Sequence, residues 1–352
     1  MIETITNVNS FVNGLVWGWP ALILLGFVGV LMTILTHFFQ ITHFGHWVRQ
    51  TIGAIFGNKH VTQHTTDRSI SQFQSLCTAL AATVGTGNIV GVAGAIAVGG
   101  PGAVFWMWLI AFFGMMTNFS ENVLGILYRR KNMDGEWCGG AMYYLRDGLG
   151  SSVMVHSNSN VKEPVRQGMW GIFEVFADTI VVCTLTALTI LTSGAIDLNT
   201  GLMTEEAAAI GSSSLMSYAF RQTFGSVGAA FIAIAILLFA YSTVLGWSHY
   251  GSKACEYIFG TKSITIYRIV FSFIVLAGSM MKAQLAWDIS DTFNGLMMLP
   301  NLIGVIALSP VVMKCTKNYI DRRILNKTGL EPMLSAFPDV QAEQVADFGE
   351  ND

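Results

Sequence analysis

The sequence predicts an all-α membrane protein, a polytopic bundle of about seven transmembrane helices, and three observations carry this prediction. Charged residues make up only 12% of the 352 residues, against about 25% in soluble domains. Apolar residues, 52% of the chain, gather in blocks of about twenty, the length of helix that crosses a hydrocarbon core of ~30 Å. The Lys and Arg residues, 19 in all, fall mostly in alternate connections between these blocks.

Seven apolar blocks give the expected spans in order. They cover residues 17–36, 73–98, 102–128, 168–193, 226–247, 264–285 and 293–313. The stretch from Met1 to Trp17 carries Glu3 and no Lys or Arg, so it lacks the basic region that opens a cleavable signal peptide. We therefore expect the first span to be retained in the lipid bilayer.

The basic residues predict the orientation of these spans, because cytoplasmic connections carry an excess of Lys and Arg. The first, third and fifth connections and the start of the C-terminal tail hold Arg49, Lys59, Arg68, Arg129, Arg130, Lys131, Arg146, Lys162, Arg166, Lys253, Lys262, Lys314, Lys317, Arg322, Arg323 and Lys327. The opposite side has only Arg221, in a connection that also carries Glu205 and Glu206. We expect a multi-pass protein of the cell membrane, with its N-terminus outside and its C-terminus cytoplasmic.

Composition also predicts the domain organisation and excludes some functions. Residues 1–328 form one transmembrane domain, and the polar tail 329–352, rich in Glu, Asp and Gln, is expected to be disordered. The net charge of −3, without a strong basic block, argues against nucleic acid as a partner. The five cysteines show no CxxC spacing and are interpreted as packing residues. The five histidines between His37 and His64 match no metal-ligand spacing.

The second span contains the most informative motif, Thr83-Val-Gly-Thr-Gly-Asn88. Gly, Thr and Asn are poor helix formers, and unwound backbone inside a membrane is tolerated only where it lines a protein-enclosed cavity. There, freed carbonyls can coordinate a cation, and the N–H groups of the next half-helix can hold a carboxylate. The alternative is close helix packing through Gly87, Gly91 and Gly94. The residues alone favour neither interpretation.

Six strings of sequence carry a resemblance to a known family. In order they are Cys77–Asn88, Gly99–Trp108, Gly139–Tyr144, Pro164–Gly171, Asp178–Thr186 and Leu245–Tyr250. They resemble the alanine or glycine:cation symporter family, the sodium:alanine symporters, in order from about residue 10 to 315. The resemblance implies a LeuT-like core of two inverted five-helix repeats behind one extra helix, and symport of alanine or glycine with Na⁺ or H⁺. It implies no other cofactor and no further metal.

On this resemblance, the second span is the first of two broken helices that hold the substrate. Gly85, Thr86, Gly87 and Asn88 would face the substrate carboxylate and the cation. The fifth span would close the cation site, which is expected to comprise Ala82, Thr83, Ser242 and Thr243, because a hard cation favours carbonyl and hydroxyl oxygens. Alternatively, the hydroxyl groups bond back to carbonyls of their own helix.

The sequence departs from the family pattern at Gly148-Leu-Gly-Ser151, which leads almost at once to Pro164. Family members continue into further helices before a second Gly-Leu-Gly-Ser. Three spans and most of a fourth, the second broken helix, are expected to be missing near 148–152, roughly a hundred residues at ~20 per span plus loops. An even number of lost crossings preserves the orientation pattern. We expect an incomplete inverted-repeat fold that transports poorly or not at all as a monomer.

Three carboxylates lie within the expected spans, namely Glu121, Glu174 and Asp178. Carboxylates inside a membrane are usually functional, but these three are expected toward the inner face, near Arg129 and Arg166. A cytoplasmic gate or ion-pair cluster and a proton relay are both compatible with that position, and the ion-pair cluster is favoured.

Two other function classes compete with symport. A non-transporting seven-helix receptor or sensor fits the topology but not the glycine-rich break, and an inactive truncated paralogue fits the shortened pattern. A membrane-embedded enzyme would need paired catalytic groups. The sequence has no HExxH and no GxSxG, so we expect that the protein is not an enzyme.

Overall fold

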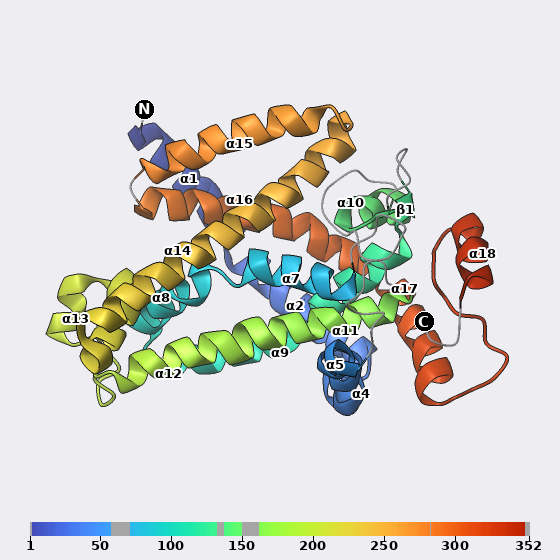
Figure 1. Ribbon diagram of the computed structural model, residues 1–352, viewed down its shortest axis with the longest axis horizontal. Helices are drawn as coiled ribbons and strands as arrows, with labels where there is room; N and C mark the ends of the chain where they lie inside the picture. Colours follow the sequence, from blue (N-terminus) through green and yellow to red (C-terminus); the bar gives the residue numbers. More distant parts are fainter. Residues whose placement is uncertain (1, 58–70, 132–136, 150–161, 282, 349–352) are drawn as a thin grey trace. The chain divides into compact units, whose positions relative to one another are not determined.

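A computed structural model describes residues 2–57, 71–131, 137–149, 162–281 and 283–348, and Figure 1 shows them coloured from blue to red along the chain. They divide into two compact units. Unit 1 comprises Met1–Phe73, Met116–Gly171 and Ser248–Asp352, and unit 2 comprises Gln74–Met115 and Ile172–Trp247. Each unit is described by itself.

Unit 1 is helical apart from one short hairpin. Its helices are α1 (Ile2–Val16), α2 (Trp19–Leu35), α3 (Phe39–Thr42), α4 (Phe44–Gln50), α5 (Ile52–Gly57), the end of α9 (Gly102–Leu127), α10 (Ala141–Tyr143), the π-helical turn η2 (Tyr144–Gly148), most of α11 (Pro164–Val175), the end of α14 (Leu215–Phe259), α15 (Ser263–Ser279), α16 (Ala283–Ala307), α17 (Ser309–Tyr319), the π-helical turn η5 (Ile320–Ile324) and α18 (Pro338–Ala346). The hairpin pairs β1 (Arg130–Lys131) with β2 (Trp137–Cys138) in antiparallel register.

Within unit 1, α1 lies along α16, and Figure 1 shows the two side by side. The Nδ2 atom of Asn13 donates a hydrogen bond to the hydroxyl of Thr292 at 3.1 Å. Gly295 lets the helices approach closely, because a Cβ at that position would overlap Val16 and Trp17. Small residues at helix crossings of this kind are typical of membrane proteins.

Unit 2 comprises most of α7 (Gln72–Thr83), the 3₁₀ turn η1 (Thr86–Asn88), α8 (Val90–Gly99), the start of α9, the π-helical stretch η3 (Phe176–Cys183), α12 (Thr184–Thr192), α13 (Glu205–Ile210), the 3₁₀ turn η4 (Ser212–Ser214) and most of α14. Its core joins α8, α12 and α14, and includes Ala93, Ile96, Ala187, Ile190 and Ile232.

The apolar helices agree with a multi-pass membrane protein. Among the described residues, three helices are long and apolar enough to cross a membrane, and the number rises to six if each bent pair of helices counts as one span. The shorter apolar helix α15 stands at the sixth expected span. All seven ranges expected from the sequence overlap one of these helices, while the count of seven remains a prediction. The start expected at 226 follows a kink at Gly225, whose φ of 63° interrupts α14.

The C-terminal segment differs from the expectation of a disordered tail. Residues 329–348 pack against unit 1, and Leu334 is fully buried. The Ala336 N–H donates to the Leu127 carbonyl at 2.9 Å, and Lys131 pairs with Glu343 at 2.7 Å. The guanidinium group of Arg130 lies 3.5 Å from the centroid of the Phe337 ring. Composition missed this order because it comes from specific contacts of a few residues with a basic helix end.

Candidate binding site at the broken helix

The second expected span is broken in the structure at the predicted motif. α7 ends at Thr83, η1 covers Thr86–Asn88, and α8 begins at Val90. The two halves are bent by 60°. Between them, Gly85 adopts an extended backbone, with φ of −135° and ψ of −159°. Of the two interpretations that the motif left open, the structure shows the broken helix, and we call residues 84–89 the helix break.

The side chain of Asn88 folds back across the helix break. The Gly85 N–H donates to Asn88 Oδ1 at 3.0 Å, which replaces a backbone bond that the helix has lost. Asn88 is only 5% exposed. Its Nδ2 donates to Asp178 Oδ1 at 2.7 Å and to Cys183 Sγ at 3.4 Å. The helix break is therefore tied to a second segment of unit 2.

That second segment is η3, which is π-helical from Phe176 to Cys183. π-Helical turns widen the helix by one residue per turn and often stand at functional sites. Here the two partners of Asn88, Asp178 and Cys183, lie near the start and at the end of η3. The sequence indicated neither η3 nor the contact with Cys183, which we had interpreted as a packing residue.

α14 closes over the helix break on the expected side. A Cβ placed on Gly85 would stand 2.5 Å from Thr243 Oγ1. A Cβ placed on Gly246 would stand 2.8 Å from the Cβ of Ala82. The structure thus brings Ala82, Gly85 and Thr243 together. Gly246 is a contact residue that we did not predict, although its spacing of three from Thr243 places both on one helix face.

The hydroxyl groups expected at the cation site bond within their own helices. Ser242 and Thr243 both donate to the Phe239 carbonyl at 2.9 Å, and Thr83 donates to the Ala79 carbonyl at 3.1 Å. This is the alternative noted from the sequence. It leaves the hydroxyl oxygens able to accept, because a hydroxyl that donates its proton keeps its lone pairs. Thr86 is partly buried and Gly87 is exposed at the turn.

The three carboxylates within the spans belong to different units. Glu121 lies in unit 1 and accepts from Asn301 Nδ2 at 2.6 Å, while the Tyr144 hydroxyl donates to Asn301 Oδ1. Asp178 lies in unit 2 and accepts from Asn88. Glu174 is a partly buried residue of unit 2. A common gate for the three remains a prediction, and the contacts described above give Glu121 and Asp178 separate amide partners.

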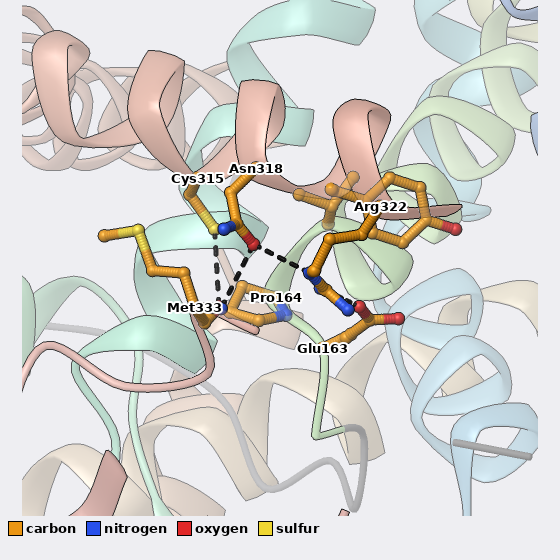
Figure 2. Close-up of a pocket in the computed structure, with 8 residues that line it drawn as sticks. Glu163, Pro164, Cys315, Asn318, Arg322 and Met333 are labelled. Atoms are coloured by element: carbon orange, nitrogen blue, oxygen red, sulfur yellow. Dashed lines mark hydrogen bonds and ion pairs between the residues drawn. The ribbon is translucent and has the colours of Figure 1, made fainter. Parts of the chain in front are cut away.

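One small cavity lies in unit 1, between the start of α11 and the C-terminal helix (Figure 2). Its empty volume is about 140 Å³. The Glu163 carboxylate, 2% exposed, pairs with Arg322 and, at 3.2 Å, with Arg323. Asn318 Oδ1 accepts from Arg322 Nε at 3.0 Å. These polar groups are satisfied by one another, which is typical of a structural ion-pair cluster.

The described residues also bear on the expectation of no resident metal. Within them, no group of three or more His, Cys, Asp and Glu side chains is arranged to hold a metal ion. Of the clustered histidines, His60 and His64 lie outside the described residues. His46 is half-buried and hydrogen-bonds the Tyr319 hydroxyl at 3.0 Å.

A broken apolar helix covered by a second helix with hydroxyl groups defines a class of membrane transport proteins, and comparison with known proteins specifies it. The sequence profile of the sodium:alanine symporter family matches residues 2–155 and 146–335. The chain belongs to the sodium:alanine symporter family. The resemblance read from its motifs is thereby confirmed.

Similar proteins carry names of amino-acid transporters. The sodium/alanine symporter AgcS of Methanococcus maripaludis is 30% identical, over 92% of this chain and 98% of its own length. An uncharacterized transporter of Haemophilus influenzae is 28% identical over the same shares. The probable sodium/glutamine symporter GlnT of Bacillus subtilis is 27% identical, over 95% of this chain and 94% of its own length.

These comparisons also contain a gap. The alignment with the Haemophilus protein has 463 positions, which is 111 more than the 352 residues of this chain. The relative therefore has at least that many residues without a counterpart here. The two matches of the family profile overlap at residues 146–155, the stretch that contains Gly148-Leu-Gly-Ser151.

Proposed function

We propose that this chain binds a small neutral amino acid, alanine or glycine, together with Na⁺ or H⁺ at the helix break, as a shortened symporter of the cell membrane. The observation that carries the proposal is the helix break itself, with Gly85 in contact with Thr243 of α14. The family and the names of its members support cation-coupled amino-acid transport.

Each part of the helix break offers one kind of ligand. The N–H groups of η1 and the start of α8, from Thr86 and Gly87 onward, stand at a helix N-terminus and suit the carboxylate of an amino acid. The carbonyl groups of Ala82 and Thr83 at the end of α7, with the hydroxyl oxygens of Ser242 and Thr243, suit a hard cation. In this proposal, the coupling ion and the amino acid bind at opposite sides of the same interruption.

The proposal includes an internal deletion, placed at residues 148–152. The longer alignment and the doubled match at 146–155 support it. The lost residues would include the second broken helix of a LeuT-like inverted-repeat fold, so one wall of the substrate cavity would be missing. We propose seven spans with an outside N-terminus, and transport by the monomer that is slow or absent.

Binding and uptake have to be measured separately. Purified protein in detergent is titrated with alanine and glycine, with and without Na⁺, while thermal unfolding is followed. We expect each ligand to raise the unfolding midpoint more when the other is present, as linkage requires for coupled binding. Stabilisation that is independent of Na⁺ at several pH values would contradict coupled binding.

Uptake of labelled alanine into vesicles that hold only this chain tests the deletion. We expect less uptake than with a full-length relative reconstituted at equal density. Saturable uptake at the rate of the relative would refute the impaired-transport part and leave the binding part intact. Binding without uptake would favour an inactive paralogue or a sensor.

A further inference from the structure

The hydrogen bonds of Asn88 account for both of its donor hydrogens. An Asn amide has two N–H donors and one carbonyl oxygen. One N–H points to Asp178 Oδ1 at 2.7 Å, with the Asp178 carbonyl 3.3 Å away, and the other points to Cys183 Sγ at 3.4 Å. The oxygen accepts the Gly85 N–H at 3.0 Å. The side chain is 5% exposed, so little of it faces a cavity.

This pattern conflicts with a direct role in holding the amino acid. A carboxylate ligand is an acceptor and needs free N–H donors, and those of Asn88 are engaged inside the protein. We propose that Asn88 is instead a positioning residue: it holds Gly85 in its extended conformation, and Asp178 is the anchor that orients the Asn88 amide. The inference deepens the proposed function and rests on it.

The geometry explains why the anchor is an Asp on a π-helix. A hydrogen bond to an ionised acceptor is shorter and stronger than a neutral one, and the 2.7 Å bond from Asn88 to Asp178 is the shortest of the four. The η3 stretch carries both Asp178 and Cys183, so one segment receives both N–H groups. The amide orientation is thereby fixed, and its oxygen is directed to Gly85.

An exchange of the two side chains tests this network. Asn88→Asp alone places two carboxylates in hydrogen-bond contact, which is unfavourable. The double variant Asn88→Asp with Asp178→Asn restores it, because the carboxylate at position 88 accepts from Gly85 and the amide at position 178 donates back. We expect the single variant to weaken alanine affinity about tenfold or more, and the double variant to recover it to within about threefold.

A second pair of variants covers the case in which Asn88→Asp does not fold. Asp178→Asn keeps an acceptor oxygen for the Asn88 amide, and we expect nearly unchanged affinity. Asp178→Leu is similar in size but removes the acceptor, and we expect a loss of about tenfold. The matched control is Thr179→Val, because the Thr179 hydroxyl contacts the other oxygen of Asp178 only at 3.4 Å and has no bond with Asn88 in this network.

The ligand-free unfolding midpoint and hydrogen exchange at the Gly85 amide are measured for every variant. They decide the network even if the wild-type chain binds neither alanine nor glycine, a result that would reject only the proposed function. Protection of the Gly85 amide that is lost in Asn88→Asp and recovered in the exchanged pair supports the inference. An exchanged pair that remains as weak or as unprotected as Asn88→Asp overturns it.

Discussion

The contact between Gly85 and Thr243 makes a sharp prediction about packing at the helix break. Gly85→Ala is not a test of backbone strain, because a φ of −135° is open to any residue. The added Cβ would stand 2.5 Å from Thr243 Oγ1, while the next nearest atoms, Thr243 Cβ and Cγ2, are at 3.6 and 3.7 Å. A single atom of α14 therefore causes the conflict.

The magnitude follows from how this conflict can be relieved. Rotation of the Thr243 side chain would give up its 2.9 Å hydrogen bond to the Phe239 carbonyl, a loss of about 1 kcal/mol. A shift of α14 would disturb the equally close contact of Gly246 with Ala82, and overpacking of this kind costs about 1–3 kcal/mol. We expect Gly85→Ala to lower the free energy of unfolding by about 1–3 kcal/mol.

Thr243→Ala removes the conflicting oxygen and is the expected suppressor. With only the Cβ of residue 243 left, at 3.6 Å, the added methyl group makes an ordinary contact. The double-mutant cycle should give a coupling energy of about 1 kcal/mol or more in favour of the pair. Reversible unfolding in detergent without ligand measures it, so the result does not depend on transport.

Gly87→Ala is the matched control, because a Cβ there meets nothing within 4 Å although it lies in the same turn. We expect a change within about 0.5 kcal/mol. Additive effects of Gly85→Ala and Thr243→Ala would refute the contact between α14 and the helix break. An equal cost at positions 85 and 87 would show that backbone freedom, rather than packing, determines the effect.

Three further predictions concern unit 1. Glu163→Gln should lower the free energy of unfolding by about 3 kcal/mol, since it neutralises a buried partner of Arg322 and Arg323, whereas Asp321→Asn, whose partner Lys327 is exposed, should cost less than about 1 kcal/mol; equal costs would contradict the burial of Glu163. Leu334→Ala should cost about 2–5 kcal/mol in the same unfolding measurement, because Leu334 is fully buried, and no effect is what a disordered tail requires. Burial, and then the charges of Arg49 and His43, hold the pKa of His46 below its usual value of 6.5, so the unfolded chain takes up the proton first and stability is lost as the pH falls below about 6.5; His46→Gln should reduce the fall in unfolding midpoint between about pH 7.5 and 5.5, and an unchanged fall would assign it to other groups.

The sequence predicted the helix break because its signal is local. Gly85, Thr86 and Asn88 interrupt an apolar block with residues that disfavour a helix, and the structure breaks there by 60°. The approach of α14 was predicted only through the family resemblance, because nothing local connects Ser242 or Thr243 with Ala82. The boundaries of α15 and the extra helix α1 differ from the expected spans, since hydropathy alone does not locate turns.

Other parts of the site depend on partners far apart in the chain. Asn88 and Asp178 are separated by 90 residues, and no periodicity records their pairing. The π-helical register of η3 is set by packing and hydrogen bonding that a propensity scale does not contain. The tail gave the opposite error, because its composition resembles that of a disordered segment, while Leu334 and Phe337 provide enough specific contacts to order it.

The distribution of these residues between the two units leads to one last argument. Every residue proposed to bind the ion or the amino acid, from Ala82 to Thr243, lies in unit 2. The merged Gly148-Leu-Gly-Ser151 string lies in unit 1. Packing of the helix break against η3 and α14 therefore needs no residue at the proposed deletion. Ion-dependent stabilisation should survive in this chain even where uptake does not, and a protein that shows neither would place the effect of the deletion in the folding of unit 2.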